Sequence, residues 1–242
     1  MLTASLLACD AHPRALPPLR AARAQTAVRS ALLEALVQLP PNLRSQLQEV
    51  LSSVVYADFP ERFPELLPAV QAGLGSGNGP RTRAALQALR VIARKYEFRT
   101  GDDEKGPMRD MMAATFPALL GLFRALLEQP SADVAIAEML KLVCKVFWSA
   151  SFLELPPMLR DPRGADTAMW LQCFLVAITK PVPTEGAPGA DDPEGRTKWP
   201  WWKAKKWALH VAGRLHSRYG DPKVRHSDRC TRSCAHVDVL AR

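Results

Sequence analysis

Apolar residues recur at steps of three and four positions along most of this chain, which is the period of an amphipathic helix. The first such stripe runs from Val28 to Leu39, and Pro40 and Pro41 end it because proline cannot continue a helix. Equivalent stripes predict further helices over residues 43–54, 61–73, 81–96, 108–128, 132–149, 165–179 and 200–219. No segment shows the alternating pattern of a β-strand. The pattern therefore predicts an all-α protein.

Short loops separate these helices, so consecutive helices are expected to pack as antiparallel pairs. The loops are rich in glycine at 73–80, charged at 101–107, and rich in proline, glycine and acid at 181–198. Helical pairs that repeat at about 40 residues are typical of HEAT and armadillo solenoids. The pairs share almost no sequence with one another, so periodicity alone leaves a helical bundle open.

The last predicted helix contains the most distinctive stretch of the chain. Four of the six tryptophans and three lysines fall within nine residues, from Trp199 to Trp207. Pro200 is well placed to open the helix, because a first-turn N–H has no helical partner in any case. We predict that one apolar stripe of this helix is buried and supplies structural anchors. The anchors are Trp201, Trp202, Trp207, Val211 and Leu215.

A basic face is expected opposite that stripe, formed by Lys203, Lys206, His210 and Arg214. We predict that Lys203, Lys205 and Lys206 face solvent and are the candidates for binding a partner. Lysines interleaved with aromatic residues also occur in proteins that bind single-stranded nucleic acid. However, Trp207 falls on the apolar stripe and is not expected to stack on bases, so an acidic protein surface is the favoured partner.

The positive charge of the chain is concentrated near its end. The net charge is +8, yet residues 196–242 hold twelve basic and three acidic side chains, a balance of +9. The other 195 residues are nearly neutral. Electrostatic attraction to an acidic partner is therefore expected to be local and sensitive to salt.

The sequence contains no motif for catalysis or for a cofactor, so we expect neither an enzyme nor a bound cofactor. In the tail, His226, Cys230, Cys234 and His236 are residue types that bind zinc, but their spacing fits no common zinc finger. We therefore expect no bound metal. Five scattered cysteines suggest a reducing compartment. No apolar run reaches the roughly 18–20 residues needed to cross a bilayer, so we expect no membrane insertion.

Three segments of the chain carry a family resemblance. The first is Val28–Leu36, with Asp58-Phe59-Pro60-x-Arg62-Phe63 after it. The second is Lys95-Tyr96-Glu97-Phe98. The third is the acidic loop Asp191-Asp192-Pro193-Glu194, followed by Trp201-Trp202-Lys203-x-Lys205-Lys206-Trp207-Ala208-Leu209-His210, Arg214-Leu215 and Arg218-Tyr219-Gly220. In this order they resemble the importin-β (karyopherin) superfamily, in the branch of importins seven and eight, also called Ran-binding proteins seven and eight. Phe63 stands where the family usually has tryptophan, and Ala204 where it usually has cysteine.

The resemblance implies a partial HEAT-type solenoid, an α-α superhelix of helical pairs with disordered termini. We expect residues 1–24 to be an ill-ordered leader and residues 25–220 to be HEAT-like repeats resembling the N-terminal arch of an importin. Residues 221–242 are expected to be a basic, disordered tail. Because receptors of this family are several times longer, we expect the chain to be a fragment of one or a truncated product.

The function that the resemblance implies is that of a nuclear transport receptor segment. Such a receptor acts in Ran-dependent import of proteins and passes between cytoplasm and nucleus. Its implied partners are the Ran GTPase, cargo proteins and nucleoporins, with no nucleic acid among them. The alternative is a stand-alone helical-repeat scaffold or adaptor without transport activity. Neither the cargo nor individual Ran-contacting residues can be identified from the sequence.

Overall fold

The computed structural model describes residues 18–130, 132–161 and 164–219, and within these residues the protein is helical throughout, with no β-strand. The helices are α1 (Pro18–Gln38), α2 (Pro41–Asp58), α3 (Leu66–Leu74), α4 (Gly79–Tyr96), α5 (Asp102–Glu128), α6 (Val134–Ala150), α7 (Ala165–Thr179), α8 (Pro193–Lys198) and α9 (Pro200–Tyr219), with one 3-10 turn, η1 (Pro157–Leu159). The prediction of an all-α fold is confirmed.

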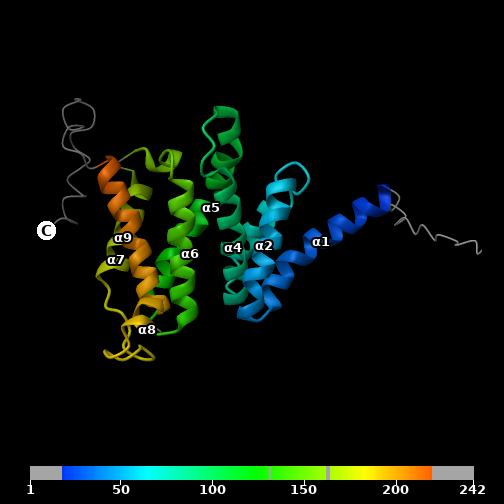
Figure 1. Ribbon diagram of the computed structural model, residues 1–242. Helices are drawn as coiled ribbons and strands as arrows, with labels where there is room; N and C mark the ends of the chain where they lie inside the picture. Colours follow the sequence, from blue (N-terminus) through cyan, green and yellow to red (C-terminus); the bar gives the residue numbers. More distant parts are fainter. Residues whose placement is uncertain (1–17, 131, 162–163, 220–242) are drawn as a thin grey trace, which may run out of the picture.

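The helices follow one another across the molecule in two layers (Figure 1). In one layer α2 contacts α4, α4 contacts α6, and α6 contacts α9. In the other layer α3 contacts α5 and α5 contacts α7, while α1 packs on α2 and α4 at one end. Most of these contacts join a helix to its own pair or to the next pair, as in a solenoid.

An aromatic cluster fills the space between α5, α6 and α7. Trp170 of α7 is 2% exposed, and its ring lies 4.9 Å from Phe147 of α6 and 5.6 Å from Phe116 of α5, measured between centroids. Phe174 packs edge-on against Phe147 at 4.9 Å and against Phe123 at 5.3 Å. These five rings join three helices, so the cluster couples two successive helical pairs.

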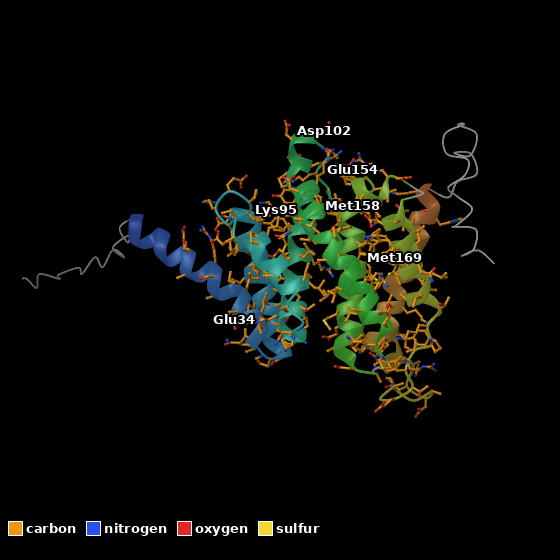
Figure 2. The ribbon with its side chains drawn as sticks, turned by 180° about the vertical axis from the view of Figure 1, so that it is seen from behind. Glu34, Lys95, Asp102, Glu154, Met158 and Met169 are labelled. Atoms are coloured by element: carbon orange, nitrogen blue, oxygen red, sulfur yellow. The ribbon has the colours of Figure 1, made fainter. Side chains whose placement is uncertain are left out.

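Helix α5 begins earlier than the sequence predicts, because residues 102–107 are helical and do not form the expected charged loop. Asp102, Asp103 and Glu104 occupy its first turn, where carboxylates interact favourably with the free N–H groups and the helix dipole. Asp102 lies at this end of α5 in Figure 2. The charges that suggested a loop are therefore those that favour a helix start.

Two prolines lie inside α5, at Pro107 and Pro117. A proline removes one backbone hydrogen bond and pushes against the carbonyls of the preceding turn. Next to Pro117, the carbonyl of Ala114 accepts a hydrogen bond of 2.9 Å from the Gln71 side chain of α3. The neighbouring helix therefore supplies a donor to the turn before Pro117, although the carbonyl that loses its helical partner is that of Ala113.

By length and composition alone, α5 is the one helix among the described residues that could cross a membrane. Half of its apolar window is buried inside the protein, as expected for a core helix. Met111, Phe116 and Phe123 on this helix are each at most 1% exposed. Its uncharged run extends from Met111 to Phe123, between Asp110 and Arg124, and the packing of α5 accounts for this apolar composition.

The remaining differences from the predicted elements are small. Helix α1 begins at Pro18, so residues 18–24 of the expected ill-ordered leader are helical. Helix α3 begins at Leu66 and not at Glu61. Helix α8 lies in the predicted loop and is capped by Asp192, whose side chain accepts a 2.8 Å hydrogen bond from the Gly195 N–H. Residues 1–17 and the predicted tail 221–242 lie outside the described residues.

The segment around Asp58 joins the end of α2 to α1 and to the following turn. Arg29 of α1 donates through Nε and Nη2 to Asp58 Oδ2, at 2.9 and 2.7 Å. Arg62 Nη2 lies 3.0 Å from the other carboxylate oxygen. Phe59 and Phe63, which follow Asp58 in the sequence, are both buried. The carboxylate thus pairs with two guanidinium groups while its neighbours enter the core.

The segment Lys95–Phe98 at the end of α4 connects two neighbouring pairs. Lys95 donates to the carbonyls of Val55 and Phe59 at the end of α2 (Figure 2). Glu97 is 3% exposed and accepts a 3.2 Å hydrogen bond from the Ser149 hydroxyl of α6. This segment therefore contacts the pair before it and the pair after it.

Truncating the central aromatic ring should destabilise the protein strongly. We expect Trp170→Ala to lower the free energy of unfolding by about 3–5 kcal/mol, because it empties a site lined by four aromatic rings. Trp202→Ala is the matched control, since Trp202 is 39% exposed. Thermal unfolding followed by circular dichroism measures both. Equal melting temperatures for the two variants would contradict the proposed role of the cluster.

Removing the carboxylate at position 58 should leave a buried guanidinium, that of Arg29, without its partner. We expect Asp58→Ala to cost about 3 kcal/mol, because Arg29 is then desolvated and unpaired. Glu194→Ala removes an exposed pair with Lys198 and should cost less than about 1 kcal/mol. Urea denaturation compares the two variants. Adding Arg29→Met to Asp58→Ala should recover part of the loss, and no recovery would argue against the pairing.

Candidate partner-binding surface

Five basic side chains gather on the face shared by α4, α6 and α9, and we refer to them as the basic cluster. The cluster consists of Arg90 and Arg94 of α4, Lys141 and Lys145 of α6, and Lys203 of α9. Arg94 is exposed, and the other four are half-buried. The other four cations lie close enough to Lys145 for their charges to lower its pKa.

Local spacing and helix stacking together bring these residues into one place. Arg90 and Arg94 are four positions apart, as are Lys141 and Lys145, so each pair lies on one face of its helix. The two helices run in the same direction, because Arg83 lies beside Glu138 and Glu97 farther along lies beside Ser149. The two basic pairs therefore form neighbouring rows.

The positive charge of Lys145 is unfavourable in the folded protein. Burial lowers its pKa to about 8, and the cations Arg90, Lys141, Lys203 and Arg94 add to this effect. The pKa of Lys141 is also lowered, again by burial first and then by Lys203 and Arg90, while Glu138 opposes the shift. No carboxylate acts on Lys145 in this way among the described residues.

Among the described residues, the carboxylates that act on the basic cluster are Glu138 and Glu97, at its two ends. Glu138 lies 4.0 Å from Arg83 at one end, and Glu97 lies 3.4 Å from Arg94 at the other. Between them Arg90, Lys141, Lys145 and Lys203 form no ion pair within 4.0 Å with any described residue. The middle of the surface therefore carries positive charge without a direct ion pair among the described residues, although Glu97 acts on Arg90 and Glu138 on Lys141 from the two ends.

Aromatic rings border the basic cluster. The Lys145 ammonium lies 4.8 Å from the centroid of the Trp207 ring, which packs edge-on against Trp148 of α6 at 5.9 Å. Arg214 stacks on the other side, with its guanidinium carbon 3.3 Å from the Trp148 centroid, and it donates to the Trp148 carbonyl. Arg214 was predicted on the basic outer face, but the structure places it against α6.

A groove continues the same face toward α2. It has a volume of about 410 Å³ and is lined by Arg44, Ser45, Gln48, Arg83, Gln87, Val134, Ala135 and Glu138. The Nε atom of Arg83 and the Oε1 atom of Gln87 are buried without a hydrogen-bond partner among the described residues. Unsatisfied buried polar atoms of this kind are destabilising.

The predicted anchors of the tryptophan helix differ in burial. Trp201 is 8% exposed and donates a 3.1 Å hydrogen bond to the Ala132 carbonyl, and Val211 is 1% exposed. Trp207 and Leu215 are partly buried against the core. Trp202 is 39% exposed, so its assignment as an anchor was wrong. Consecutive helical residues point about 100° apart, so Trp201 and Trp202 cannot both face the core.

The three candidate lysines point in different directions. Lys203 belongs to the basic cluster and is half-buried, although the sequence predicted it to be solvent-facing. Lys205 lies 5.8 Å from the Trp202 ring and lines a small apolar groove beside Lys180. Lys206 is exposed. The run of three lysines is therefore not a single binding surface.

Sequence reasoning missed the basic residues on α4 and α6. Arg90, Lys141 and Lys145 fall in stripes that predict buried helices, and the spacing of four between basic residues was the only signal of a shared face. That signal becomes informative only when α4 and α6 are known to be neighbours. The structure supplies this relation.

The described residues contain no group of three or more His, Cys, Asp and Glu side chains that could hold a metal. Burial raises the pKa of the Cys144 thiol to about 12 and that of Cys173 to about 11, so neither is a reactive thiolate at neutral pH. The zinc candidates His226, Cys230, Cys234 and His236 lie outside the described residues.

Comparison with known proteins identifies relatives of this chain. No family model matches it. Over 149 residues it is 42% identical to the importin beta-like SAD2 homolog of Arabidopsis thaliana and 30% identical to importin-8 of Mus musculus, covering 62% of this chain and 14% of each relative. Among solved structures, the exportin Cse1 in its cargo-free, cytoplasmic state matches with a TM-score of 0.69 at 19% identity. That match covers 85% of this chain and 22% of Cse1.

The structural match shows the fold to be a HEAT-type helical solenoid. The sequence matches confirm the resemblance to the importin-β superfamily, of which the relatives are members. The relatives are named as importins, and the present chain is a segment that resembles such a nuclear transport receptor. It spans about 14% of the length of the relatives it matches.

The depressed pKa of Lys145 predicts how its charge affects stability. Below about pH 8, Lys145 is protonated in both the folded and unfolded states, and its charge is unfavourable in the folded state. Between about pH 8 and the ordinary lysine pKa near 10.5, the folded state loses this proton first, so stability rises with pH.

We therefore expect Lys145→Met to be more stable than the unaltered protein at pH 7. The gain should be of order 1 kcal/mol after allowance for solvent screening, or about 2–4 °C in melting temperature. The gain should shrink toward about pH 10, where the lysine is neutral. Lys206→Met, at an exposed position of α9, is the control. A Lys145→Met protein that melts lower at pH 7 would contradict this electrostatic account.

Proposed function

We propose that this chain is a segment of a nuclear transport receptor of the importin type, acting in Ran-dependent import of proteins. The observation that carries the proposal is the 42% identity over 149 residues with an importin beta-like relative. The receptor as a whole is proposed to move between cytoplasm and nucleus and to contact Ran, cargo proteins and nucleoporins.

The positions of the resembling segments support this proposal. Asp58 joins α1 and α2, Lys95 and Glu97 connect α4 to both neighbouring pairs, and Arg214 joins α9 to α6. Asp58 holds the two helices of one pair together, while Lys95, Glu97 and Arg214 hold one pair to the next. A function that depends on the shape of a solenoid fits this distribution better than a function that depends on a reaction centre.

In such a receptor the proposed mechanism is competition between two ligands. Cargo and Ran bound to GTP each change the affinity for the other, and this coupling free energy is stored in small movements between repeats. We propose residues 25–220 as the repeat unit that takes part. The face of α2, α4, α6 and α9 is its proposed binding surface, because it combines unneutralised charge with an open groove.

A chimera tests the proposal. We expect mouse importin-8, with its matching 149 residues replaced by those of this chain, to import a reporter cargo in permeabilised cells supplied with Ran and GTP. The same chimera carrying Trp170→Ala should lose import together with folding stability. A chimera that folds and melts cooperatively but imports nothing would favour a helical scaffold without transport activity.

A binding comparison separates this segment from the rest of the receptor. We expect the isolated chain to bind Ran-GTP far more weakly than the chimera does, because a solenoid adds binding free energy over many repeats. A pull-down at matched salt concentration compares the two proteins, with Ran-GDP as the control. Equal binding would show that the Ran-contacting residues lie within this chain.

A further inference from the structure

The middle of the α4–α6–α9 face has features expected of a site for a negatively charged ligand. Four partly desolvated cations, Arg90, Lys141, Lys145 and Lys203, lie together without a carboxylate of the described chain within 4.0 Å. Keeping like charges together costs folding free energy, and local costs of this kind occur in proteins mainly where a function requires them. An anion bound among these residues would offset that cost.

The arrangement of the cations restricts the shape of the ligand. Along each helix the basic residues are four positions apart, which corresponds to a rise of about 6 Å. Neighbouring packed helices lie about 8–10 Å apart. In an extended peptide, side chains on the same side recur every second residue, at about 6.6 Å. Acidic residues at alternate positions of an extended peptide therefore match the rows formed by Arg90 with Arg94 and by Lys141 with Lys145.

The borders of the site favour a short peptide over a nucleic acid. The Glu138 carboxylate, which is 37% exposed, lies at one end of the site, so a phosphate backbone that continued past Arg83 would meet its negative charge. The Trp207 ring is covered by the Lys145 ammonium and packs against Trp148, which leaves it poorly placed to stack on a base. A short acidic segment needs neither a free ring nor a long basic track.

We propose that the basic cluster binds a short, extended acidic segment of a protein partner, with acidic side chains at alternate positions seated between α4, α6 and α9. This proposal deepens the proposed function and rests on it, because the proposed function implies that the partner is a protein. In the bound state Lys145 is paired with a carboxylate, and the ammonium form becomes the favoured one. Binding is accordingly accompanied by proton uptake near pH 8.

A peptide-binding measurement tests the proposal on the full 242-residue chain. The probe is a fluorescein-labelled peptide of alternating glutamate and glycine, and fluorescence anisotropy measures its affinity at pH 7 and at fixed salt. Lys145→Gln and Lys203→Gln should each weaken binding at least about fivefold, since each removes one charge-assisted contact. Raising the pH from 7 to about 9 should also weaken binding to the unaltered chain, because Lys145 loses its charge.

The matched control is Lys205→Gln. It removes the same charge from the same helix, but Lys205 lies beside Trp202 and away from the cluster. We expect its affinity to stay within about twofold of the unaltered protein. The basic residues beyond position 219 give the same background in every variant. Melting temperatures of all variants are measured in parallel, so that loss of folding is separated from loss of binding.

Three results would overturn the proposal. The first is an equal loss of affinity in Lys203→Gln and Lys205→Gln, which would indicate general electrostatics. The second is equal binding of a peptide in which glutamine replaces glutamate. The third is tighter binding of oligothymidylate than of the acidic peptide, which would indicate a nucleic-acid site. The import assay with the chimera does not depend on this peptide, so failure here leaves the proposed function to be judged separately.

Discussion

The position of α6 between α4 and α9 is the constraint on which the rest of the structure depends. A solenoid has no central core, so each pair is stabilised only by its neighbours. On one side, Glu97 of α4 accepts a hydrogen bond from Ser149, and on the other, Arg214 of α9 stacks on Trp148. These contacts keep the three helices running in the same direction. Glu97 and Arg214, which fall in the segments that resemble the importin-β superfamily, both lie at these junctions.

The helices were largely predictable because each must bury one apolar stripe, and this requirement is visible in the sequence. The errors occurred where another local force decides the structure. Asp102, Asp103 and Glu104 look like a loop in composition, yet they stabilise a helix start through its dipole. Trp202 looks like an anchor, yet helical geometry turns it away from the face that Trp201 occupies.

The candidate surface was much less predictable than the fold. The residues of the basic cluster come from three helices, those on different helices are more than 40 positions apart in the chain, and no pattern along one helix identifies them. The run Lys203, Lys205 and Lys206 attracted attention because its charges are adjacent in sequence. In space only Lys203 joins Arg90, Lys141 and Lys145. Helix stacking determines which basic side chains share a binding surface, and stacking depends on contacts between side chains far apart in sequence.

The same stacking explains why the cluster can persist without its own carboxylates. Trp148, Trp207 and Arg214 pack α6 against α9 directly beside Lys145, and the aromatic cluster around Trp170 holds α6 against α5 and α7 from the other layer. Apolar burial of this extent contributes several kcal/mol for the large aromatic side chains. That contribution exceeds the order of 1 kcal/mol that a half-exposed, repelled lysine costs. The core can therefore hold the cations in place, and their unneutralised charge remains available to an acidic partner.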